Sequence, residues 1–313
     1  MRRYFGVDAS GVGWAHAVNS RAELAAALND PTVHMLEADI LMCSKDLGPS
    51  RRKSSRFALQ PIMCHPPAKD SDLTFDEFTR TVIASLRGGR KVGLKLDFKQ
   101  MECVAPCLDL LRARGFGLES QSSYSVNAGE FEDVPLWLNA DVIRGPGGRE
   151  PIDGPSFVST CVSTCPHATL SLGWTHTGTP LLGYTHAMAL EMKKLVAPLR
   201  CDVTLAASAA HLFASANPAR AVLIDDVVNG GGEVSDARVG GSRDVPGRSF
   251  TLWGPSPGPV TRWIERELPP EATYVDVKAC NWKEEAVVRL YVYTRPAWAT
   301  LHDARLWLFS RRR

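Results

Sequence analysis

The sequence predicts an α/β fold, a TIM-type (β/α)8 barrel in which residues 1–313 form one domain. Three observations lead to this prediction. About eight short apolar segments alternate with helical patterns, which is typical of a parallel sheet. A chain of 313 residues is long enough for a complete barrel. No glycine-rich dinucleotide fingerprint follows the first segment, which favours the barrel over a doubly wound sheet.

The predicted strands are runs of apolar residues, most of them with polar residues on one face. They span residues 14–19, 33–40, 91–99, 135–143, 168–174, 202–208, 249–253 and 272–277. A shorter extended piece at 61–67 is stopped by two prolines, because proline cannot donate to a strand ladder. The strands alternate with predicted helices, so consecutive strands are expected to lie parallel.

Helix start signals separate several of these strands. Ser20 and Thr74 are expected N-caps, each followed three residues later by a glutamate, as in a capping box. Further helices are expected at 104–114, closed by Gly115, and around 185–196. Two segments fall outside this pattern. Residues 217–248, rich in Gly, Asp and Arg, predict a long surface insertion, and the alternating tail from residue 283 predicts extra strands.

Composition excludes several classes of protein. The chain is 44% hydrophobic and 22% charged with a net charge of +2, so no global field favours nucleic acid as a partner. No apolar run reaches membrane-spanning length, which predicts no transmembrane segment. The basic start is interrupted by Asp8 where a signal peptide would continue, which predicts a cytoplasmic protein. None of the eight cysteines forms a C-x-x-C pair, so reduced thiols are expected rather than zinc ligands.

Polar side chains follow one face of several strands toward their carboxyl ends. In the strand at 91–99, Lys95, Asp97 and Lys99 share one face because side chains alternate along a strand. The same pattern places His16, Asn19, Glu37, Asp39, Asn139 and Asp141 at neighbouring strand ends. Barrel enzymes carry their chemistry at this end, so these residues are expected to form a site.

Three carboxylates of this set suit a divalent cation. Glu37 and Asp39 lie two residues apart on one face, about 7 Å at the backbone, and Asp97 follows on the neighbouring strand. An all-oxygen site of this kind favours Mg²⁺ or Ca²⁺. The alternative is structural: Glu37 forms a buried ion pair with Lys95 or Lys99.

Two histidines and the lysines could supply the chemistry. His16 and His65 are candidates for an acid–base pair, because imidazole titrates near neutral pH. Lys99, with Lys95, would neutralise charge on a substrate oxygen. Schiff-base chemistry on either lysine is a third reading, but acidic neighbours would keep the lysine protonated.

Six motifs resemble the menorin family. They are His16-Ala-Val-Asn19, Leu36-Glu-Ala-Asp-Ile40, His65-Pro-Pro67, Lys95-Leu-Asp-Phe-Lys99, Trp137-Leu-Asn-Ala-Asp141 and Leu170-Ser-Leu-Gly-Trp174. In order and spacing they are also similar to glycerophosphodiester phosphodiesterases and phospholipase D-like barrels. The resemblance covers about residues 14–175 and thins beyond them.

The resemblance implies a metal-dependent phosphodiester hydrolase. Glu37, Asp39 and Asp97 would hold one Mg²⁺ or Ca²⁺, His16 and His65 would act as acid and base, and Lys99 would bind phosphate. The substrate would be a glycerophosphodiester or lipid-like small molecule, and its expected further contacts are Asn19, Lys95, Asn139, Asp141, Trp174 and Trp253. The alternative, which the menorin resemblance also implies, is a non-catalytic barrel that recognises a ligand or a protein partner.

Overall fold

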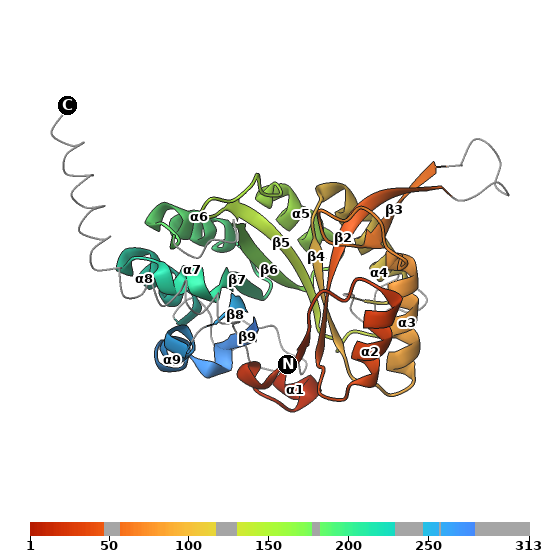
Figure 1. Ribbon diagram of the computed structural model, residues 1–313, viewed down its shortest axis with the longest axis horizontal. Helices are drawn as coiled ribbons and strands as arrows, with labels where there is room; N and C mark the ends of the chain where they lie inside the picture. Colours follow the sequence, from red (N-terminus) through yellow and green to blue (C-terminus); the bar gives the residue numbers. More distant parts are fainter. Residues whose placement is uncertain (47–56, 117–129, 177–181, 229–246, 257, 279–313) are drawn as a thin grey trace.

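A computed structural model describes residues 1–46, 57–116, 130–176, 182–228, 247–256 and 258–278. Eight parallel strands follow one another around a nearly closed barrel (Figure 1). They are β1 (Trp14–Ala15), β2 (Met35–Asp46), β4 (Gly93–Phe98), β5 (Leu136–Arg144), β6 (Thr169–Thr175), β7 (Val203–Ser208), β8 (Arg248–Pro255) and β9 (Thr273–Lys278). The predicted TIM-type barrel is confirmed.

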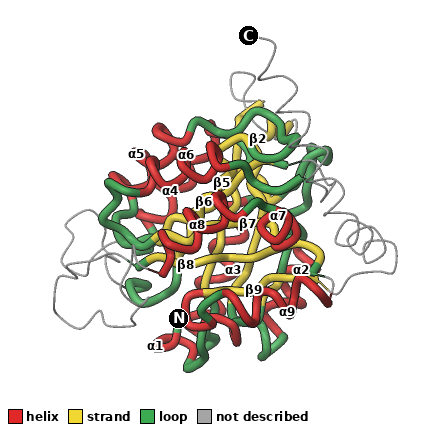
Figure 2. The backbone as a smooth tube through the Cα atoms, turned by 90° about the vertical axis from the view of Figure 1, so that its left-hand side faces the viewer, coloured by secondary structure: helices red, strands yellow, loops and turns green. Residues whose placement is uncertain are grey.

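Helices surround the strands on the outside (Figure 2). They are α1 (Arg2–Phe5), α2 (Arg21–Asn29), α3 (Phe75–Arg87), α4 (Val104–Ala113), α5 (Gly154–Thr164), α6 (His186–Val196), α7 (Ala209–Ala214), α8 (Asn217–Val228) and α9 (Gly258–Glu267). Both predicted N-caps form, since the side chains of Ser20 and Thr74 accept hydrogen bonds from the amides of Glu23 and Glu77. No described helix combines the length and the apolar character needed to cross a bilayer.

Strand alternation divides the barrel wall into two faces. The outward side chains, such as Leu36, Leu94 and Leu96, are completely buried against the helices. The inward side chains are apolar near the amino ends of the strands, where Met35, Trp137 and Tyr274 belong to one cluster. Beyond this layer the inward side chains become polar or charged. The fold therefore concentrates buried charge in the carboxyl half of the barrel interior.

A two-stranded ribbon extends one wall of the barrel. The second half of β2 pairs antiparallel with β3 (Phe57–Met63), in register from Ile40 opposite Met63 to Asp46 opposite Phe57. This ribbon projects beyond the barrel in Figure 1. The sequence predicted a polar loop here and a short extended piece at 61–67, so the strand begins earlier than expected. Hairpin pairing with β2 supplies the backbone hydrogen bonds that the local sequence does not signal.

The predicted surface insertion is wrong over residues 217–228. These residues form α8, which packs against α6 and β8. Its buried side chains include Ala219, Leu223 and Val227, at helical spacing. Apolar residues lie on the other sides of the helix as well, Val228 being half exposed and Asp226 buried, so the sequence shows no clear amphipathic pattern. Residues 229–246 and the predicted strands after residue 283 lie outside the described residues.

Candidate active site

A cluster of charged side chains lies inside the barrel toward the carboxyl ends of the strands. The sheet register places Glu37 beside Lys95 and Asp39 beside Asp97 on β2 and β4. Asp97 is in turn the partner of Asn139 on β5. The predicted side chains of β1, β2, β4 and β5 are therefore neighbours because the strands are parallel and in register.

Glu37 is the most buried carboxylate of the cluster, with 4% of its surface exposed. Its Oε1 lies 3.0 Å from Nζ of Lys95, which is itself 2% exposed. Burial disfavours the charged form of Glu37, yet Lys95 and then His16 hold its pKa well below the ordinary value. Burial likewise opposes the charge of Lys95, but Glu37 and Asp97 raise its pKa. The two residues thus form a buried ion pair, as the structural alternative for Glu37 expected.

Lys99 lies between two carboxylates nearer the mouth of the barrel. Its Nζ is 2.9 Å from Oδ1 of Asp39 and 2.5 Å from Oδ2 of Asp97. Although burial works against its charge, Asp97 and Asp39 raise its pKa. Asn19 orients Asp39 from the other side, since its Nδ2 donates to Oδ2 (2.8 Å) and its Oδ1 accepts from the Asp39 amide (2.9 Å). Asn19 therefore fixes the orientation of the Asp39 carboxylate through these two hydrogen bonds.

His16 contacts a carboxylate, that of Asp276, which was not among the predicted site residues. Its Nδ1 lies 2.9 Å from Oδ2 of Asp276 on β9, and 3.1 Å from Oε2 of Glu37. The hydrogen bond to Asp276 and the nearby Glu37 raise the pKa of His16 to about 10, against the effect of burial. The raised pKa favours the protonated ring at neutral pH, and 34% of the side chain remains exposed. The only sequence signal for Asp276 is that it lies two residues after Tyr274, and therefore on the same face of β9.

Asp141 adds a further acid at the end of β5. Burial, and then repulsion from Asp97, raises the pKa of Asp141 to about 7. Gly173 on β6 allows its close approach, because a Cβ at position 173 would lie 2.6 Å from Oδ1 of Asp141. The cluster contains five carboxylates against two lysines and one histidine. Burial, together with this surplus of negative charge, favours the protonated form of Asp141.

The Asp141→Asn substitution is expected to stabilise the protein at high pH only. An acid with a raised folded-state pKa binds its proton more tightly when folded, so it costs stability as pH rises from about 4, the unfolded value, to about 7. The Asp141→Asn side chain does not ionise, so the stability of the variant does not fall in this way as the pH rises. Urea unfolding in EDTA should give nearly equal stabilities at about pH 4 and a more stable variant at about pH 8. A variant less stable than the wild type at the higher pH would contradict this assignment.

Besides Trp174, which is described below, three of the predicted site residues make their contacts outside these ion pairs. Asn139 is buried and its Oδ1 accepts a hydrogen bond from Ser171 Oγ at 2.6 Å. Trp253, at the end of β8, packs its ring 4.5 Å from that of His176. His65 is exposed on the loop after β3, with Nδ1 2.5 Å from the Pro66 carbonyl oxygen. The structure therefore does not bring His65 into contact with the cluster.

The expectation that Trp174 contacts substrate is corrected by its position. Trp174 is completely buried, and its Nε1 donates to the Met188 carbonyl oxygen of α6 at 3.3 Å. Its ring packs 4.7 Å from that of Tyr184. Alternation along β6 turns Ser171 and Gly173 inward, so Trp174 points outward to the helices. Trp174 is a core residue.

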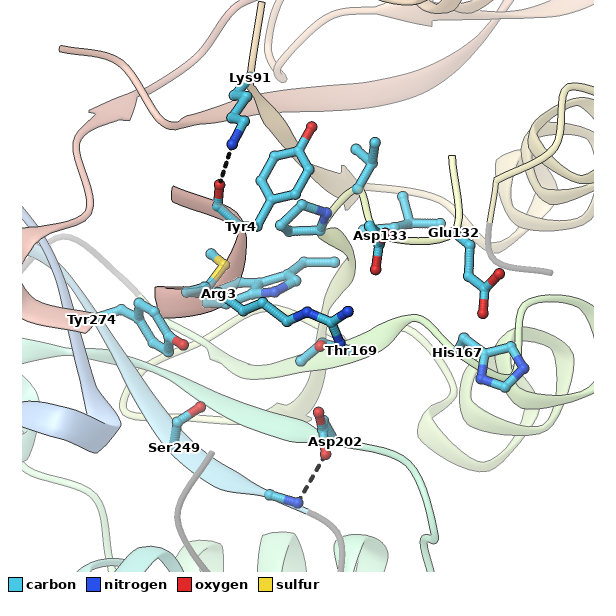
Figure 3. A pocket seen from close by; sticks show the side chains of 16 residues that line it. Arg3, Tyr4, Lys91, Glu132, Asp133, His167, Thr169, Asp202, Ser249 and Tyr274 are labelled. Carbon is cyan, nitrogen blue, oxygen red and sulfur yellow. Dashed lines mark hydrogen bonds between the residues drawn. The ribbon is translucent and has the colours of Figure 1, made fainter. Parts of the chain in front are cut away.

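A cavity of about 420 Å³ lies at the opposite end of the barrel (Figure 3). Its lining includes Tyr4, Lys91, Thr169, Asp202 and Tyr274, which lie near the amino ends of the strands. Two polar groups there are occupied, since Lys91 Nζ donates to the Tyr4 carbonyl oxygen and Asp202 accepts from the Gly247 amide. None of the charged cluster lines this cavity. Since barrel chemistry is found at the carboxyl ends, we take the charged cluster as the candidate active site.

The cluster has the composition expected of a site for a hard divalent cation. Its donors are carboxylate oxygens in surplus over the cationic groups, and Oε2 of the buried Glu37 lies 3.1 Å from His16 Nδ1 rather than beside a lysine. Within the described residues, the compact group of donor atoms is His16 Nδ1, a Glu37 oxygen and an Asp276 oxygen, all within 4.8 Å. The predicted set of Glu37, Asp39 and Asp97 is bridged instead by the two lysines.

Fold and site together define a (β/α)8 barrel protein with a buried charged cluster at the carboxyl ends of its strands. The family described as Menorin N-terminal domain matches residues 8–230, more than half of the chain. The chain therefore belongs to the menorin family, as its motifs indicated.

Two individual proteins are similar to parts of this chain. Protein FAM151B of Homo sapiens is 35% identical over 207 residues, which cover 65% of this chain and 64% of the human protein. The chain thus spans less than two thirds of that relative. A solved structure of a Rubisco-like protein from Rhodopseudomonas palustris has a TM-score of 0.45 at 11% identity, covering 94% of this chain and 66% of the other.

Proposed function

We propose that this protein is a metal-dependent phosphodiester hydrolase, related in chemistry to phospholipase D and acting on a glycerophosphodiester or lipid-like substrate. The observation that supports the proposal is the convergence of His16, Lys99 and a surplus of carboxylates at the carboxyl ends of the barrel strands. Phosphoryl chemistry needs cationic groups to neutralise the phosphate and a proton donor for the leaving group. The cluster offers both.

Glu37, Asp39 and Asp97 would hold one Mg²⁺ or Ca²⁺, which when bound would polarise the phosphate. Lys99 is the least buried ammonium of the cluster, 19% exposed at its side chain, and would neutralise a non-bridging oxygen. Trp253, at the end of β8 and partly exposed, would contact the rest of the substrate.

The charged state of His16 assigns its part in the reaction. A protonated imidazole donates its proton to the leaving alkoxide as the bond from phosphorus to that oxygen breaks. A new bond forms from phosphorus to an attacking water or substrate hydroxyl, which gives its proton to a base. His65 is the candidate base, because the Cys64 amide beside it donates to the Asp39 carbonyl oxygen at 2.8 Å and ties its loop to the end of β2.

Hydrolysis of glycerophosphodiesters and lysophospholipids in the presence of Mg²⁺ or Ca²⁺ tests this proposal. The wild type should release the alcohol product, EDTA should abolish the release, and His16→Ala should retain only background activity because the proton donor is removed. Product is measured by chromatography across a broad substrate panel. A wild type that never exceeds the His16→Ala variant would exclude the proposed function.

A non-catalytic binding protein is the second candidate. The ion pairs of the cluster favour it. Lys95 and Lys99 already neutralise the carboxylates of Glu37, Asp39 and Asp97, so these carboxylates do not require a metal ion. Calorimetry with Mg²⁺ and Ca²⁺ separates the two. Binding that is lost in Glu37→Gln and retained in the surface control Glu271→Gln supports the hydrolase. A wild type that binds neither cation supports the binding protein.

A further inference from the structure

We propose that Asp276 is the positioning residue of His16: it holds Nδ1 of the ring toward the barrel wall and so leaves Nε2 facing the substrate. This inference deepens the proposed function and rests on it for its catalytic consequence. The geometric part stands on one contact, the 2.9 Å hydrogen bond between Nδ1 of His16 and Oδ2 of Asp276.

The chemistry of the two partners sets the direction of this hydrogen bond. An ionised carboxylate only accepts, so Nδ1 of His16 must carry the hydrogen. A histidine has two ring nitrogens, and Nε2 is then the one available for proton transfer. The carboxylate also prevents the ring from turning over, because a flipped ring would lose the contact. This is the part that a buried acid plays for the histidine of a serine protease triad.

Other groups near His16 are less suited to this part. Glu37 lies 3.1 Å from Nδ1, but its other oxygen is paired with Lys95 in the buried ion pair. Glu37 is also a proposed cation ligand, whereas Asp276 lies outside that set. Asp276 is 9% exposed, and its Oδ2 lies closer to His16 Nδ1 than the Glu37 oxygen does, at 2.9 Å against 3.1 Å.

The fold brings these two residues together from opposite ends of the chain. His16 follows β1, the first strand of the barrel, and Asp276 lies on β9, the last. The register of β9 with β8 places Asp276 beside Trp253. The position of Asp276 is therefore set by a strand ladder rather than by a loop, which is what an orienting residue requires.

Nitrogen-15 NMR of the histidine rings tests the inference directly. The spectra are recorded on the full chain in EDTA, and the His16 signals are assigned by their loss in His16→Ala. The wild type should show a protonated Nδ1. Asp276→Ala should shift the Nδ1 signal, because its hydrogen loses the Asp276 acceptor, and the control Glu271→Gln should leave the His16 signals unchanged. Asp276→Asn keeps the side-chain shape and serves if the alanine variant does not fold.

Kinetics supply the catalytic consequence. In Asp276→Ala we expect kcat to fall by about 10²–10⁴-fold, with KM changed less than threefold, because ring orientation matters for proton transfer and not for binding. Unchanged His16 signals in both Asp276 variants would overturn the inference. So would loss of Mg²⁺ binding together with unchanged signals, since Asp276 would then be a ligand. If the wild type hydrolyses nothing, the proposed function fails while the NMR result still decides the position of His16.

Discussion

Replacing Lys95 with methionine is expected to lower the free energy of unfolding by about 3–5 kcal/mol. The reason is the environment of Glu37, which is 4% exposed and whose nearest cation is the Lys95 ammonium at 3.0 Å. Without that ammonium the carboxylate remains buried in a cluster with four other acids and keeps only the partly exposed His16 ring beside it. Urea unfolding of the full chain in EDTA, followed by circular dichroism, measures the loss.

A double substitution tests whether the loss belongs to the pair. Lys95→Met combined with Glu37→Gln leaves no uncompensated charge, so it should be more stable than Lys95→Met alone. The matched control is Lys91→Met, an exposed lysine near the start of the same strand, which should change stability by less than about 0.5 kcal/mol. Equal losses in the Lys95→Met and double variants would show that packing, rather than charge, explains the effect.

Replacing Lys99 with methionine is expected to reduce the proposed hydrolysis strongly while it strengthens cation binding. Its ammonium lies between Asp39 and Asp97, so its removal leaves two proposed ligands with their full negative charge for Mg²⁺. The phosphate of the substrate loses its neutralising partner, and kcat/KM should fall by about 10²–10³-fold.

Calorimetry and the hydrolysis assay measure these two effects on the same protein. Lys194→Met, at an exposed position of α6, is the control and should leave both unchanged. Activity within tenfold of the wild type would remove Lys99 from the proposed mechanism. Weaker Mg²⁺ binding would show that the ammonium does not compete with the cation.

Alternation explains why much of the barrel interior could be predicted. In the strand around Lys95 and Asp97, the polar and apolar faces differ so sharply that period two alone assigns each side chain to the inside or outside. Parallel pairing then makes Glu37 a neighbour of Lys95. The same rule assigns Trp174 to the outer face, and its prediction as a substrate contact failed because the motif was read without its alternation.

Contacts between distant parts of the chain could not be predicted. Asp276 is 260 residues from His16, and only closure of the barrel brings them together. Nothing in the residues 272–277 themselves indicates a partner on the first strand. The helix that begins at Asn217 was missed for a different reason, because its apolar residues are spread around the helix and show no single buried stripe until it is packed against α6 and β8.

The place where the barrel closes has a consequence for how the protein inactivates. Within the described residues, backbone pairing runs from β1 around to β9, and no ladder joins β9 back to β1. His16 and Asp276 lie on the two sides of this seam and are held by a side-chain hydrogen bond. Side-chain contacts open at a lower free energy than a strand ladder. Local breathing of the seam would therefore separate His16 from its partner, and the candidate site would come apart before the rest of the barrel unfolds.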